Sequence, residues 1–142
     1  MTDQPTLKPH LMDIADSPVK RFLQSAGRGV RLKCPYCGGG DIFDSWFTLK
    51  RQCPTCGVTY AYEDGYFLGS YAINLVFTEL IAVAIVISLI IWSDLSVLQM
   101  QIAAVVLAVG FPLLGYPFAL LIWVALDVAL HPPDPRTGKR AI

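Results

Sequence analysis

Two cysteine motifs constrain this chain more than any other feature of its sequence. Residues 34–57 contain two Cys-Pro-x-Cys-Gly motifs, and their cysteines are all the cysteines of the chain: Cys34, Cys37, Cys53 and Cys56. Two Cys-x2-Cys turns, called knuckles below, commonly supply the four thiolates of a tetrahedral zinc site. The sequence therefore predicts a closed metal site with these four ligands, and a closed site is structural rather than catalytic.

The thiols are expected to stay reduced, because the first residues carry no basic stretch followed by an apolar leader. One structural Zn²⁺ is the predicted metal. Iron is kept as an alternative, since tetrahedral sulfur sites suit either metal. About 30 residues cannot build a sufficient core alone, so the metal is expected to hold this segment folded.

The segment around the cysteines, residues 31–65, is predicted to be a small β zinc ribbon. β-branched and aromatic residues favour strands at 42–43, 47–52 and 58–62. Asp44 and Ser45 are the predicted turn between the first two strands. Trp46 and Phe47 are expected to fill the small core of the ribbon.

The residues before the ribbon divide into two parts. Residues 1–16 are polar, contain two prolines and are predicted to be a disordered tail. Residues 17–30 are predicted to form a short, basic, amphipathic helix that starts at Ser17-Pro18 and is ended by Gly27 and Gly29. Its apolar face is expected at Val19, Phe22, Leu23 and Ala26. Such a helix can lie on an anionic membrane surface or pack on the rest of the protein.

The second half of the chain is strongly apolar. The expected segments are transmembrane helix 1 at 66–92, an external loop at 93–101, transmembrane helix 2 at 102–130 and a polar tail at 131–142. Helix 2 is expected to be kinked at Pro112 and Pro117, with two half-length segments as the alternative. The predicted fold is thus a zinc ribbon followed by a two-helix transmembrane hairpin.

Basic residues predict the orientation of this hairpin. Eight of the 11 Lys and Arg precede residue 52, three follow residue 135, and none lies between. Because positive flanks stay on the cytoplasmic side, the ribbon and both termini are expected in the cytosol. The predicted location is the inner membrane, as a multi-pass protein.

Two acidic residues within the predicted spans are candidates for function. Counted by helix rise from the expected cytosolic interface, Glu79 would lie about 12 Å deep and Asp127 about 6 Å deep. The two carboxyl groups could face each other and form part of an ion path, or receive a partner's helix. The simpler interpretation is hydrogen bonding between the helices, with Asn74 and Thr78 on one face and His131 placed to pair with Asp127.

From Ser17 to Pro135 the sequence resembles domain-of-unknown-function family 983. The resemblance rests on the two knuckles, the basic Arg-Gly-Val-Arg-Leu-Lys at 28–33, the aromatic strand after the second knuckle, and Glu-Asp-Gly-Tyr-Phe at 63–67. It implies a small bacterial membrane protein with a cytosolic zinc ribbon, the four cysteines as metal ligands and two transmembrane helices. Many members have Gly-Asp-Gly-Pro at the start of the first span, where this chain has Glu-Asp-Gly-Tyr. The family implies no established activity.

These observations predict a non-enzymatic adaptor or assembly factor for a membrane-protein complex. The sequence contains no nucleophile–base pair and no phosphate-binding loop. A rubredoxin-like electron carrier and an oligomeric ion or metal transporter are the alternatives. The expected partners are the lipid bilayer and a membrane protein, and a homo-oligomer stays open. Nucleic acid is not expected, because the basic residues near the ribbon are explained by membrane orientation.

Overall fold

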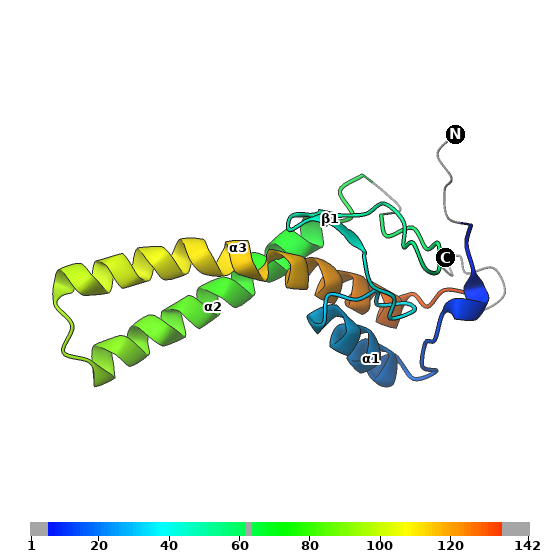
Figure 1. Ribbon diagram of the computed structural model, residues 1–142. Coiled ribbons are helices and arrows are strands. Elements are labelled where there is room, and N and C mark those ends of the chain that lie inside the picture. The colour runs from blue at the N-terminus through cyan, green and yellow to red at the C-terminus, as the bar shows by residue number, and fades with distance from the viewer. Residues whose placement is uncertain (1–5, 62–63, 135–142) are drawn as a thin grey trace.

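The computed structural model describes residues 6–61 and 64–134. Its elements are η1 (Pro9–Leu11), α1 (Pro18–Val30), β1 (Phe43–Ser45), β2 (Thr48–Leu49), α2 (Leu68–Trp92) and α3 (Val97–Leu130). The long helices α2 and α3 form a helical hairpin, and the ribbon, η1 and α1 gather at one end of it (Figure 1). The predicted fold class is confirmed: a small two-stranded sheet precedes two long apolar helices.

Both helices of the hairpin are long and apolar enough to cross a membrane. α3 begins at Val97, five residues before the predicted start, because Ser96 and Gln99 form a capping box there. The connecting loop is correspondingly shorter than the predicted 93–101. α3 also continues as one helix through Pro112 and Pro117, which contradicts the alternative of two half-length segments.

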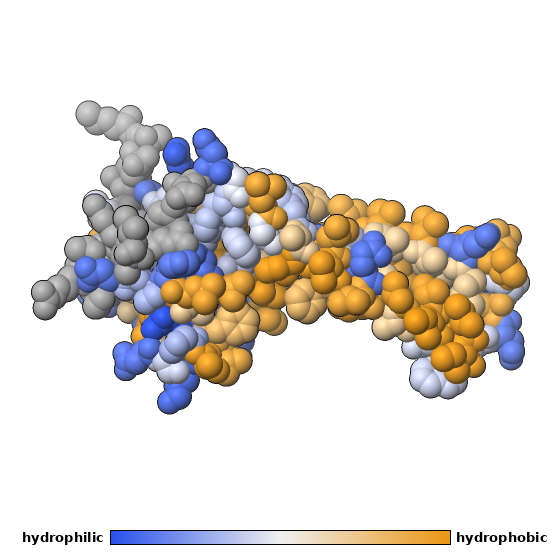
Figure 2. All heavy atoms as spheres, turned by 180° about the vertical axis from the view of Figure 1, so that it is seen from behind, coloured by the Kyte–Doolittle hydropathy of each residue, from blue (hydrophilic) through white to orange (hydrophobic). Residues whose placement is uncertain are grey.

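The two halves of α3 differ in their surroundings. Large apolar side chains in its first half, such as Val105, Val109 and Leu114, are exposed. All of its buried residues lie at or beyond Pro117. Figure 2 shows the same division as an apolar surface along the hairpin and a more hydrophilic surface at the ribbon end. The last part of α3, which is predicted to lie within the span over 102–130, is thus covered by other parts of the protein.

α1 packs antiparallel to this second half of α3. Its buried residues are Arg21, Ser25 and Gly29, which are spaced one turn apart. A Cβ added at Gly29 would lie 3.0 Å from the Cβ of Leu121, so the missing side chain permits the close approach. α1 runs from Pro18 to Val30, within the predicted helix at 17–30. The predicted apolar face is only partly packed: Val19 and Leu23 are exposed, whereas Phe22 and Ala26 are half-buried.

The N-terminal segment lies against the ribbon. The Lys8 amide donates to the Cys56 carbonyl at 2.8 Å, and the Asp13 amide donates to the Tyr36 carbonyl at 3.2 Å. These bonds link the segment to both knuckles, so the prediction of a disordered tail is wrong for residues 6–16. Residues 1–5 and most of the predicted polar tail, 135–142, lie outside the described residues.

The sheet of the ribbon is shorter than predicted. β1 and β2 are antiparallel, with Ser45 opposite Thr48, so Trp46 and Phe47 form the turn. The predicted turn at Asp44-Ser45 is wrong. The third strand is reduced to one bridge between Gln52 and Thr59. The turn, called the ribbon tip below, leaves Trp46 44% and Phe47 51% exposed, so these rings do not fill the core of the ribbon.

Candidate metal centre

The structure brings the four cysteines together. Their sulfur atoms all lie within 4.8 Å of one another, and no disulfide joins them. The sulfurs of Cys37 and Cys53 are 3.7 Å apart. Four thiolates at about 2.3 Å from a tetrahedral ion would be separated by about 3.8 Å, so this spacing fits a bound metal ion. The arrangement is one that could hold a metal ion.

The two knuckles have matching backbone geometry. Gly38 has φ of +74° and Gly57 has φ of +73°, a conformation that glycine adopts at no steric cost. Each glycine amide donates back to the carbonyl of the first cysteine of its knuckle, at 2.8 Å for Cys34 and 2.9 Å for Cys53. Each Cys-x2-Cys turn thus closes on itself and directs both thiols to one point.

Crowding of the thiols separates their pKa values. Hydrogen bonding with the Cys34 thiol lowers the pKa of Cys37 to about 7 and lowers the pKa of Cys53 far below its ordinary range. The pKa of Cys34 and that of Cys56 are raised, chiefly by hydrogen bonds with their neighbouring thiols. Four sulfur donors crowded together in this way suit a soft cation.

A buried tyrosine beside the thiols supports the same fit. Tyr60 is almost fully buried, and its hydroxyl oxygen has no hydrogen-bond partner among the described residues by geometry. Burial raises the pKa of Tyr60, and the nearby Cys34 and Cys53 raise it further, so the phenol stays protonated. Sulfur that carries the charge of a metal thiolate would be a good acceptor for this buried O–H.

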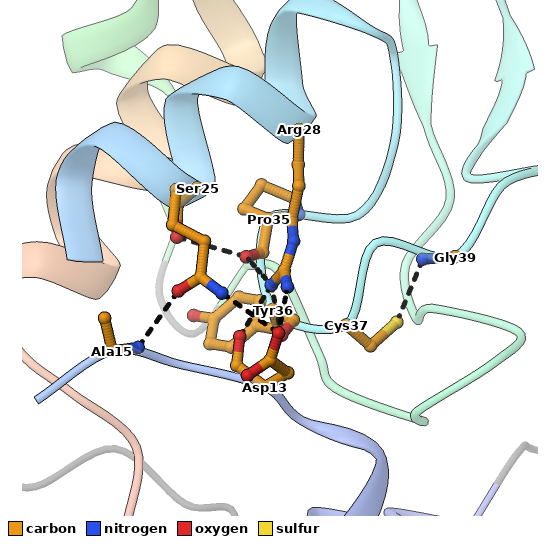
Figure 3. Close-up of polar contacts among 9 residues, drawn as sticks. Asp13, Ala15, Ser25, Arg28, Pro35, Tyr36, Cys37 and Gly39 are labelled. Atoms are coloured by element: carbon orange, nitrogen blue, oxygen red, sulfur yellow. Dashed lines mark hydrogen bonds and ion pairs between the residues drawn. The ribbon is translucent and has the colours of Figure 1, made fainter. Parts of the chain in front are cut away.

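The first knuckle is held in place by α1. Arg28 donates to the carbonyls of Asp13, Pro35 and Tyr36, and it pairs with the Asp13 carboxylate at 2.7 Å (Figure 3). The hydroxyl of Ser25 also donates to the Pro35 carbonyl, at 3.1 Å. Arg28 therefore binds the knuckle and the N-terminal segment together.

Arg21 performs a similar role at the end of α3. Its guanidinium donates to the carbonyl of Ala129 at 3.0 Å, and also to the carbonyls of Ala15 and Asp16. The last carbonyls of a helix lack intrahelical partners, and a nearby cation also suits the helix dipole. The sequence alone favours membrane orientation as the role of these arginines. The four-residue spacing of Arg21, Ser25 and Gly29 is a usable signal for a packed face.

The ribbon and α3 share one core. Leu121, Val124 and Val128 of α3 lie on one helical face and belong to the same buried cluster as three of the cysteines and the ribbon side chains of Tyr36, Ile42, Val58 and Tyr60. The metal centre is therefore built directly onto the hairpin rather than tethered to it by a free linker.

The ribbon tip is also fixed to α3. The indole of Trp46 donates to the Leu113 carbonyl at 2.9 Å. This carbonyl lacks its usual helical donor because residue 117, one turn later, is a proline without an N–H. The Trp46 and Phe118 rings meet edge-on, and Phe47 contacts Tyr116. The carbonyl left free by Pro117 thus binds the ribbon tip to α3.

Comparison with known proteins places the chain in a family. The family model described as protein of unknown function (DUF983) matches residues 43–130, more than half of the chain. The chain belongs to the DUF983 family. The match includes the second knuckle and both long helices, whereas Cys34, Cys37 and α1 precede it. No curated protein and no solved structure gives a significant match. The family, the apolar helices and the cysteine cluster fit a metal-binding membrane protein of unknown role.

In this DUF983 chain the two acidic residues of the predicted spans lie apart. Asp127 is buried, accepts a hydrogen bond from the Tyr66 hydroxyl at 2.9 Å and pairs with His131 at 3.2 Å, as the sequence allowed. Asn74 and Thr78, next to Glu79, lie against Gly115, which is twelve residues before Asp127 and so about 18 Å along α3. The expectation that the two carboxyl groups could face each other is wrong, because the second half of α3 extends beyond the level of Glu79.

Proposed function

We propose that this DUF983 chain is a membrane-anchored zinc-ribbon protein that acts as a non-enzymatic adaptor or assembly factor for a membrane-protein complex. The observation that carries the proposal is the shared core of the ribbon and α3. Cys34, Cys53 and Cys56 are fully buried, so a metal held there serves to maintain a shape. That shape is rigidly fixed to a hairpin able to span a bilayer.

The same donor set leaves a rubredoxin-like electron carrier as the second candidate. Four thiolates suit iron as well as zinc, and the half-buried Cys37 would bring the centre near the surface. Metal analysis of the purified protein with its visible spectrum tests this choice. Zinc at one ion per chain and a colourless solution are expected; a red protein with bound iron would favour the electron carrier.

The proposed orientation puts the ribbon and both termini in the cytosol of a bacterial cell, with α2 and the first half of α3 in the inner membrane. The distribution of Lys and Arg supports it. An aromatic belt at the cytosolic interface would consist of the ribbon tip, Tyr71 and Tyr116. The hydroxyls of the two tyrosines lie 3.1 Å apart. Reporter fusions at both ends and in the loop at 93–96 test this orientation.

The adaptor function predicts a partner that depends on the folded ribbon. Affinity purification in mild detergent should recover a membrane-protein complex with the native chain. The Cys53→Ser variant, which lacks one thiolate, should lose that complex while remaining in the membrane. Equal recovery with both chains would contradict the adaptor role. Ion transport is not carried forward, because Glu79 and Asp127 do not form the paired site that motivated it.

A further inference from the structure

Glu79 is an ionisable side chain on the outward face of α2. Glu79 lies eight residues after Tyr71, so helix rise places it about 12 Å beyond the aromatic belt, close to the middle of a bilayer core of about 30 Å. This position rests on the proposed function, which has α2 crossing the membrane.

Glu79 points away from α3. The side of α2 that packs on α3 contains the buried residues Ser70, Thr78 and Ala82. Glu79 is exposed, and so are Leu75, Val76 and Val83, which lie one turn away on either side. Within the described part of the chain, no hydrogen bond or ion pair involves Glu79. Figure 2 shows that the surface along the hairpin is largely apolar.

An ionisable group at this depth is costly when it faces lipid, and such groups usually meet a partner in the membrane. A basic side chain is the complement of a carboxylate. This chain has no Lys or Arg between residues 52 and 135, so neither the hairpin nor a second copy of it supplies a basic residue at this level. A basic complement for Glu79 would therefore come from a different membrane protein.

We propose that the outward face of α2 around Glu79 binds a transmembrane helix of another membrane protein, and that this helix presents a Lys or Arg to the Glu79 carboxylate. The apolar side chains at 75, 76 and 83 would pack against that helix. The ion pair would give specificity, since an apolar helix face alone selects poorly among lipid and other helices. This surface identifies where the proposed adaptor contacts its complex.

The test uses the full chain in native membranes, with a photoreactive phenylalanine analogue replacing Val83. An adduct with one other membrane protein is expected, with the cross-link in a transmembrane helix that contains a Lys or Arg. Glu79→Leu should lower the adduct yield about tenfold. Asp94→Asn, which neutralises a carboxyl group in the exposed loop, is the matched control and should leave the yield unchanged.

A charge exchange makes the test specific. Glu79→Lys combined with Glu at the partner's basic position should restore the adduct that Glu79→Lys alone removes. An adduct of twice the chain mass, adducts with lipid only, or equal yields for Glu79→Leu and the native chain would each overturn the inference. Alkaline carbonate extraction separates the two proposals: release of the protein contradicts the membrane anchor itself, whereas retention without the adduct contradicts the partner helix alone.

Discussion

The two halves of α3 have similar apolar sequences and different surroundings. Leu114, in the first half, is 64% exposed, whereas Leu121, two turns later, is fully buried under Gly29 and the ribbon. The difference shows that hydropathy reports only that a segment avoids water. It does not report whether lipid or protein replaces the water.

The length of α3 explains why both environments are needed. Its 34 residues extend about 51 Å, well beyond a bilayer core of about 30 Å. Residues 97–116 are enough to cross that core, and Tyr116 stands at the proposed aromatic belt. The remaining residues are free to act as the central helix of the ribbon domain. One helix is thus long enough to serve both as the proposed anchor and as part of the core.

Removal of a metal ligand should separate the two halves most strongly. Cys53→Ser is expected to abolish stoichiometric metal binding and unfold the ribbon, because structural zinc contributes on the order of 10 kcal/mol to folding of such domains. Hydrogen exchange should then rise in residues 117–130 and stay low in 97–114. Ser45→Ala, at the exposed end of β1, is the control. If residues 117–130 stay protected from hydrogen exchange without metal, this half of α3 does not depend on packing against the folded ribbon.

A matched pair of leucine truncations compares the halves directly. Leu121→Ala should lower the free energy of unfolding of the ribbon domain by about 3 kcal/mol, because it leaves a cavity in the shared core. Leu114→Ala, on the exposed half, should change it by less than about 0.5 kcal/mol. Denaturant titration in detergent, followed by metal release, measures both. Equal effects would contradict the division of α3.

The next largest effect is expected at Arg28 of α1, the helix that packs on the second half of α3. Arg28→Met keeps the aliphatic part of the side chain and removes its bonds to three carbonyls and the Asp13 carboxylate. A loss of about 2 kcal/mol is expected, since hydrogen bonds to charged groups contribute most when their partners are left unpaired. Arg31→Met is the control, because Arg31 is exposed. Faster metal loss to a chelator should accompany only the change at Arg28.

The smallest expected effect is at the boundary between the halves. Trp46→Phe removes the donor to the Leu113 carbonyl and should cost about 1 kcal/mol. Trp46 fluorescence should also be quenched by brominated lipid, whereas Trp123, whose indole donates to the Tyr66 carbonyl, should be protected. Single-tryptophan variants measure each signal. Strong quenching of Trp123 would contradict a boundary at the ribbon tip, because lipid would then reach further along α3.

Several features of the fold followed from local sequence. Two knuckles with glycine after the second cysteine predict their own geometry, because a turn of this kind depends on a few adjacent residues and on positive φ at Gly38 and Gly57. The existence of two apolar helices also followed, since length and hydropathy are local properties. The pairing of Asp127 with His131 followed from a four-residue helical spacing.

Other features depended on contacts between distant segments. The burial of Leu121, the roles of Arg21 and Arg28, and the exposed ribbon tip arise only where α1, the ribbon and α3 meet. The sequence does not distinguish an apolar residue that faces lipid from one that packs on protein. It also does not distinguish an arginine that sets membrane orientation from one that hydrogen-bonds neighbouring segments. The sequence determined a cysteine-rich ribbon and two apolar helices; the tertiary structure decided that the ribbon uses half of the second helix as its core.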